Sequence, residues 1–124
     1  MNEDLSSALN KINGLDLIEV NLGISSIDLL YSLSDYVESE IMLSFKDIIH
    51  LNYKGDIGEN DGSIYIGKSS LLDINVFLNN SKDLKINQYL EQLKSKGIEL
   101  KYFTIEGEIY MDIICKQINL KSKE

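Results

Sequence analysis

Arginine, proline and tryptophan are absent from this 124-residue sequence, and cysteine and histidine occur once each. The single cysteine, Cys115, excludes an intramolecular disulfide, and its apolar neighbours indicate a small core residue. One histidine and one cysteine also exclude the usual zinc sites, which need several such ligands together. No apolar run approaches the roughly 20 residues of a membrane-spanning helix, and residues 1–20 lack the pattern of a secretory signal. We therefore expect a soluble, cytoplasmic protein.

Acidic residues outnumber basic ones in the sequence. The 12 basic residues are all lysines and stand against 20 acidic residues, which gives a net charge of −8. Such a surface repels nucleic acids and anionic membranes, and it attracts a basic partner. A role in solubility alone explains the same charge. The composition, with 44% hydrophobic residues, is that of an ordinary globular protein. A chain of 124 residues is long enough to bury a core, and we expect one globular domain over residues 1–124.

Residues 98–120 contain two apolar runs joined by Glu106-Gly107-Glu108, a pattern typical of a β-hairpin. The second run carries apolar side chains on both faces, with Ile109, Met111, Ile113 and Cys115 on one face and Tyr110, Ile114 and Ile118, beside Asp112, on the other. A strand of this kind is covered on both faces. We therefore expect the hairpin to lie at the centre of the sheet.

Alternating apolar residues predict the other strands, at residues 18–24, 27–33, 40–54, 63–67 and 71–78. The longest of them places one set of apolar side chains on a common face, namely Ile41, Leu43, Phe45, Ile49, Leu51 and Tyr53. Asp47 interrupts this alternation, so we expect a bulge or a sharp twist near Lys46 and Asp47. A straight strand of this length would reach nearly 50 Å at ~3.3 Å per residue, which favours a bent one.

Helical spacing of apolar residues predicts two short helices, at residues 3–13 and 83–95, and Gly97 is placed to end the second. Strands that follow one another, with helices at the edges, are typical of an α+β protein. The predicted fold is therefore α+β, with a mainly antiparallel, twisted β-sheet and two short helices on one side.

Residues 55–62, GDIGENDG, form the most polar loop of the sequence. Its acids do not fit the calcium-loop pattern in either possible register, because a glycine or an isoleucine falls where a carboxylate is required. Its three glycines would let the loop adapt to the surface of a partner, and loops on a rigid sheet are where binding residues collect. We therefore predict a partner-binding surface, or else a solvated loop, made of Asp56, Glu59 and Asp61, with Tyr65, Glu106 and Glu108 as extensions.

Residues 62–69, GSIYIGKS, match the phosphate-loop pattern G-x-x-x-x-G-K-S/T. A working phosphate loop follows a buried strand and opens a helix, whereas Ile64, Tyr65 and Ile66 are themselves typical of a strand. The sequence therefore favours a strand here, and a nucleotide-binding or hydrolytic domain is kept as an alternative.

Catalytic residues are not indicated by the remaining polar groups. His50 lies among Ile48, Ile49 and Leu51, which is typical of a histidine on a strand surface. Glu106 and Glu108 have a spacing that suits a paired-carboxylate hydrolase, but charged residues at a solvated turn explain them better. We predict a protein that is not an enzyme and that has no catalytic residues, no metal site and no cofactor.

Two stretches together carry a resemblance to a known class of protein. Residues 39–53, SEIMLSFKDIIHLNY, resemble a strand of small bacterial proteins, and residues 102–118, YFTIEGEIYMDIICKQI, resemble the closing hairpin of the same proteins. These proteins include the immunity proteins of polymorphic or contact-dependent toxin systems. The resemblance implies a non-enzymatic antitoxin that binds one cognate toxin in the cytoplasm, and it assigns no individual binding residue.

The expected function is therefore that of an immunity protein, which binds and neutralises a basic toxin domain such as a nuclease. The expected partner is that cognate protein toxin, and neither nucleic acid nor a membrane is expected as a partner. The alternatives are the nucleotide-binding or hydrolytic domain and a structural or assembly subunit without catalysis.

Overall fold

The computed structural model describes residues 16–32, 40–55, 64–107 and 109–123 of the chain. The helix predicted at residues 3–13 lies outside these residues. Four of the predicted partner-binding residues also lie outside the described ranges, namely Asp56, Glu59, Asp61 and Glu108.

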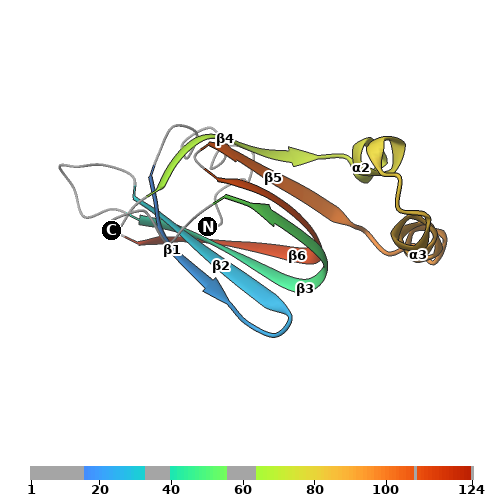
Figure 1. Cartoon of the computed structure of the whole chain (residues 1–124). Helices are drawn as coiled ribbons and strands as arrows, with labels where there is room; N and C mark the ends of the chain where they lie inside the picture. Colours follow the sequence, from blue (N-terminus) through green and yellow to red (C-terminus); the bar gives the residue numbers. More distant parts are fainter. Residues whose placement is uncertain (1–15, 33–39, 56–63, 108, 124) are drawn as a thin grey trace.

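Six strands form a closed antiparallel barrel in the order β1-β2-β3-β6-β5-β4 (Figure 1). The strands are β1 (Asp16–Leu22), β2 (Ser26–Ser32), β3 (Glu40–Lys54), β4 (Ile64–Leu72), β5 (Lys101–Gly107) and β6 (Tyr110–Lys123). The barrel closes where Asp16 and Leu17 of β1 pair with Tyr65 and Ile64 of β4. All the pairings are antiparallel, so the predicted sheet is confirmed, and closure leaves it no free edge over the paired residues.

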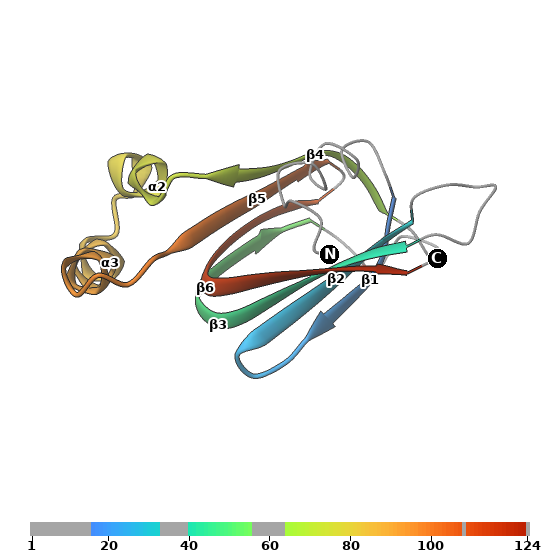
Figure 2. The same cartoon turned by 180° about the vertical axis from the view of Figure 1, so that it is seen from behind.

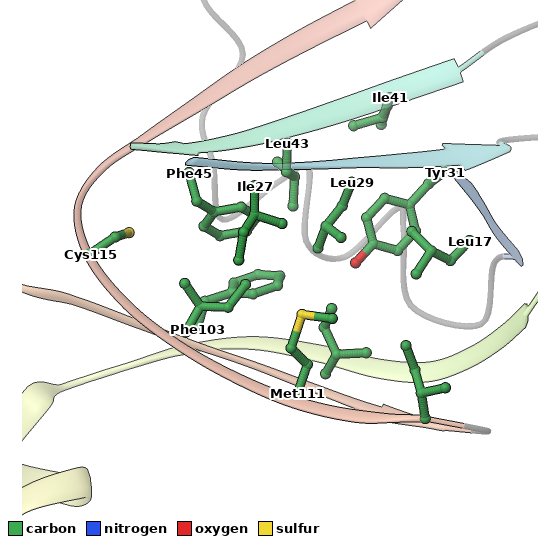
Figure 3. Packing of buried hydrophobic residues seen from close by; sticks show 13 residues of the cluster. Leu17, Ile27, Leu29, Tyr31, Ile41, Leu43, Phe45, Phe103, Met111 and Cys115 are labelled. Carbon is green, nitrogen blue, oxygen red and sulfur yellow. The ribbon is translucent and has the colours of Figure 1, made fainter. Parts of the chain in front are cut away.

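The barrel interior is filled by side chains that come from all six strands and from the β5–β6 turn (Figure 3). Its centre includes Phe45 and Phe103, whose rings lie 4.9 Å apart. The hairpin face that carries Ile109, Met111, Ile113 and Cys115 points into this core, where all four are buried. β6 lies between β3 and β5, so the central place predicted for the hairpin is confirmed.

β3 and β6 bend sharply together, and each crosses the molecule twice (Figures 1 and 2). Within β3, Asp47 has a positive φ of 57°, which is uncommon for a residue other than glycine. The β3–β6 register then shifts between Ile48 and His50. The predicted bulge near Lys46 and Asp47 is therefore confirmed, and its register shift falls slightly later in the strand.

The bend corrects three side-chain assignments made from simple alternation. Ile49, predicted to share a face with Phe45, instead packs in a second apolar cluster outside the barrel. Ile48, which alternation places on the face opposite to Phe45, and Ile118, predicted on the face opposite to Cys115, instead pack against the same core as Phe45 and Cys115. The exchange of faces is local, because Tyr53, which was predicted to share the face of Phe45, again packs against the core beyond the register shift. Alternation alone does not locate such a local exchange.

Two helices connect β4 to β5, and both lie at one end of the molecule (Figure 1). α2 (Ile74–Asn80) occupies the second half of the strand predicted at residues 71–78, so that part of the prediction is wrong. The carboxylate of Asp73 accepts a hydrogen bond from the amide of Asn75 at 2.8 Å and caps the helix. Ile74, Phe77 and Leu78, at helical spacing, then reach the second apolar cluster.

The helix predicted at residues 83–95 is confirmed as α3 (Leu84–Ser95). Asp83 accepts hydrogen bonds from the amides of Lys85 and Ile86, and Gly97 follows the helix with a φ of +80°. Leu90 and Leu93 of α3 pack with Tyr102 and Ile114, on the outer face of the β5–β6 hairpin. In the described ranges, no helix has the length and apolar character needed to cross a bilayer.

Candidate functional site

A pocket of about 410 Å³ lies on the outside of the barrel, between the β3–β6–β5 surface and the helical connection. This volume falls within the range of about 300–1,000 Å³ that is typical of ligand sites. Five barrel residues line it, namely His50, Asn52, Tyr102, Tyr110 and Asp112. The helical side contributes Phe77, Ile86 and the connection between α2 and α3, including Lys82.

The register of the strands brings the five barrel residues to one face. Asn52 of β3 lies opposite Asp112 of β6, and both His50 and Tyr102 lie opposite Ile114. Partners that lie directly opposite each other in a sheet project to the same side. Because Met111 and Ile113 point into the core, the intervening Asp112 projects outward into the pocket.

Aromatic rings form one wall of the pocket. The ring of Phe77 on α2 lies 5.2 Å from that of His50 and 5.5 Å from that of Tyr102, the second pair meeting edge to face. Such separations are favourable for aromatic pairs. Phe77 therefore fixes α2 against the barrel and gives the pocket a rigid apolar side.

Asp112 is a nearly buried carboxylate, with 8% of its surface exposed. The hydroxyl of Tyr102 donates a hydrogen bond to it at 3.4 Å, and the side chain of Tyr110 hydrogen-bonds it as well. The ion pairs formed within the described part of the chain join Lys94 to Glu91 and Lys101 to Glu99, so Asp112 has no cationic partner there.

The two tyrosine hydroxyls stay protonated in this setting. Burial, the charge of Asp112 and the hydrogen bond to it raise the pKa of Tyr102 to about 12. Burial and the hydrogen bond to Asp112 raise the pKa of Tyr110 to about 12 as well, and Glu106 adds to the effect. Both hydroxyls therefore remain donors to the carboxylate at neutral pH.

A larger hollow of about 610 Å³ lies where β4 and β5 approach the helices. Its charged groups are already engaged, because Lys101 pairs with Glu99 at 2.6 Å and Lys94 donates to Asn75 at 2.7 Å. The carboxylate of Asp73 is used as a helix cap. The Asp112 pocket is therefore the stronger candidate, since its nearly buried carboxylate forms no ion pair within the described ranges.

The structure places two of the predicted partner-binding residues. Glu106 is exposed at the end of β5, directly opposite Tyr110, so it lies next to the pocket. Tyr65 lies in β4 and pairs with Asp16 at the closure of the barrel. The predicted roles of Asp56, Glu59, Asp61 and Glu108 fall outside the described residues.

The phosphate-loop match does not form a phosphate loop in its described part. Lys68 and Ser69 lie within strand β4 and do not open a helix. Lys68 is exposed, whereas Ser69 is buried and hydrogen-bonds Tyr31 inside the barrel. The expectation of a strand at this position is confirmed. Within the same described ranges, no three potential metal ligands lie close enough to hold an ion.

Sequence reasoning did not identify the Asp112 pocket. The sequence does contain one signal for it, an aspartate within an otherwise apolar strand whose two faces are both covered. The other residues of the pocket lie far apart in the sequence. His50, Phe77 and Tyr102 become neighbours only when the barrel and the α2 helix have formed.

A scan against models of known protein families finds no match, and a search of curated proteins also finds none. The resemblance to immunity proteins stays a prediction.

Proposed function

We propose that this chain is an immunity protein, which binds and neutralises a basic toxin domain such as a nuclease. The observation that carries the proposal is the Asp112 pocket, a nearly buried carboxylate that forms no ion pair with the described residues, in a chain of net charge −8. An uncompensated buried charge is costly. A partner that supplies the opposite charge on binding would recover that cost.

Binding at the surface fits the way the barrel is built. Large aromatic and aliphatic side chains fill the interior, as in other small barrels. The outer face of β3, β5 and β6 instead carries a hollow with polar groups and aromatic rings, the features that recur at the centres of protein interfaces. These features support a function in which the outer surface of the barrel binds another protein.

The overall charge would assist such binding. The acidic side chains would take the place of the phosphates that a nuclease normally binds, and attraction between the two proteins would speed their encounter. A nucleotide-binding function receives less support, because Lys68 and Ser69 lie within a strand and Ser69 is enclosed in the core.

The proposal is tested with the genes that flank the coding sequence. Each flanking product is expressed alone and together with this chain, and growth of the host is recorded. We expect one basic product to arrest growth when alone, to be tolerated when this chain is present, and to copurify with it. A toxic flanking product that this chain neither binds nor neutralises, or flanking products that are all harmless, would contradict the proposal.

A further inference from the structure

We infer that the Asp112 pocket receives a basic side chain, an arginine guanidinium or a lysine ammonium, from the partner protein. That a protein partner supplies this side chain rests on the proposed function. The recognition of a cationic group rests on the pocket itself. The inference assigns the centre of the interface to Asp112 and to the aromatic rings around it.

The carboxylate of Asp112 has room for a further donor. An ionised carboxylate has about four lone-pair positions, and the tyrosine hydroxyls of Tyr102 and Tyr110 occupy two of them. The Tyr102 hydrogen bond is long, at 3.4 Å. A guanidinium or an ammonium group would supply the missing donors together with the missing charge, and such charge-assisted bonds are about twice as strong as neutral ones.

The rings of the pocket suit the same ligand. Phe77, Tyr102 and Tyr110 all line the space in which Asp112 lies. Aromatic faces attract cations, and they attract guanidinium groups in particular. The side-chain amide of Asn52, opposite Asp112 in the sheet, adds an oxygen that can accept a hydrogen bond. A pocket of about 410 Å³ has room for the cationic group and for part of its aliphatic stem.

Lys82 lines the pocket together with His50, and it is exposed on the rim. Asp83 beside it is engaged as the cap of α3. The charge of Lys82 therefore opposes an incoming cation. Replacing Lys82 with a neutral residue should strengthen the binding of cations, whereas a pocket for anions would respond in the opposite way.

The test uses small probes that do not require a known partner. N-acetyl-argininamide and N-acetyl-lysinamide are titrated into the full chain and followed by NMR, with N-acetyl-citrullinamide as the uncharged match for arginine. We expect the charged probes to bind, with shifts confined to the pocket residues, and citrullinamide to bind at least tenfold more weakly. Equal response to all three probes, or no response to any, would overturn the inference.

Two variants sharpen the result. Asp112→Asn keeps the shape of the side chain and removes its charge, so it should weaken the binding of argininamide at least tenfold. Lys82→Gln, at an exposed position, should strengthen it about two- to fivefold, as expected for one nearby charge. If Asp112→Asn does not fold, Lys82→Gln decides alone, because unchanged or weaker binding in that variant contradicts a cation pocket.

The inference and the proposed function can fail separately. If the charged probes bind but no flanking basic product is neutralised, the cation pocket is supported. The proposal that a toxin partner supplies the cation is then overturned. If a toxin is neutralised but Asp112→Asn binds it as tightly as the original chain does, the proposed function is supported and the assignment of the pocket is overturned.

Discussion

The hydroxyls of Tyr31 in β2 and Ser69 in β4 share a hydrogen bond of 3.3 Å inside the barrel. β1 separates these two strands in the order of the barrel, and the described pairing of β1 with β4 spans two residue pairs. The Tyr31–Ser69 bond therefore adds a link across the interior at the place where the barrel closes. Both residues are almost completely buried.

Removal of this link should destabilise the barrel. Tyr31→Phe keeps the ring and removes the hydroxyl, so we expect a loss of about 1 kcal/mol in the free energy of unfolding at neutral pH. Urea denaturation followed by circular dichroism measures this loss. Tyr89→Phe is the matched control, because the Tyr89 side chain is exposed on α3 and should leave the stability unchanged. Equal stability of the two variants would show that the link contributes nothing.

Tyr31 should also make the stability fall at alkaline pH. Burial raises its pKa from the ordinary value of 10 to about 12, although the hydrogen bond with Ser69 lowers it in part. Between these values the unfolded chain has lost the proton that the folded chain still holds, so stability decreases as the pH rises. The loss due to Tyr31 should reach about 2–3 kcal/mol near pH 12 and be absent below pH 10. Tyr31→Phe should therefore show a shallower decline than the original chain when unfolding is measured from pH 9 to 12.

Ile113 tests whether the β5–β6 hairpin is central to the fold. Its side chain is fully buried in the core, so Ile113→Asp would enclose an unpaired charge. The expected cost, several kcal/mol, is comparable to the total stability of about 5–15 kcal/mol for a typical domain, and the variant should be unfolded at room temperature. Ile24→Asp is the control, because Ile24 is fully exposed. Thermal melting of both variants gives the answer, and cooperative melting of Ile113→Asp at the normal temperature would contradict it.

Much of the sheet could be predicted from the sequence because its signals are local. Alternation of apolar residues is enough to place Met111, Ile113 and Cys115 on the buried face of β6. The α2 helix could not be found this way, since Ile74 and Val76 also alternate as they would in a strand. The cap from Asp73 and the contacts of Phe77 with His50 and Tyr102 decide the helix, and those contacts exist only in the folded barrel.

Two glycines with positive φ should respond differently to substitution. Gly55 has a φ of +136°, and an added Cβ would lie 2.9 Å from Cγ2 of Ile109, a core residue. Gly97 has a φ of +80°, and nothing lies within 4 Å of an added Cβ. Gly97→Ala should cost about 1–2 kcal/mol from backbone strain, and Gly55→Ala should cost more, about 3 kcal/mol, because the clash is added to the strain. Urea denaturation measures both values, and an equal cost would show that Ile109 moves aside freely.

The nucleotide alternative is tested by calorimetry. We expect ATP and GTP to give no binding heat, because Lys68 lies within β4 and Ser69 faces the core. Lys68→Ala, at an exposed position, serves as the control for any weak signal. A micromolar Kd that disappears in Lys68→Ala would contradict this expectation and support a phosphate site.

The candidate site was less accessible to sequence reasoning than the sheet. A net charge and an acidic loop can be read directly, whereas a pocket depends on residues from β3, α2, β5 and β6 that the fold brings together. Glu106 is the predicted residue that the register places beside the pocket, through its partner Tyr110. The bend in β3 contributes as well, because the register shift after Ile48 helps to determine which face His50 and Asn52 occupy.

The predicted acidic surface and the Asp112 pocket should affect different rate constants once the partner is in hand. Charges steer an encounter at long range, so the predicted acidic surface implies that changing Asp56, Glu59 and Asp61 together to Lys slows association severalfold and weakens its dependence on salt. A buried charge acts mainly after docking, so Asp112→Asn should leave association nearly unchanged and speed dissociation at least tenfold. Stopped-flow mixing across a range of salt concentrations separates the two effects, and melting curves check that each variant is folded.

Each outcome of that comparison bears on where the interface lies. A normal association rate in the folded triple-lysine variant would mean that the acidic surface does not guide the encounter, whatever the net charge of the chain. A normal dissociation rate in folded Asp112→Asn would mean that the partner leaves the pocket empty. If both variants behave as expected, the contact includes the outer face of β3, β5 and β6. Glu106→Gln, beside Tyr110 at the exposed end of β5, should then slow association slightly without changing dissociation, as expected of a charge on the rim.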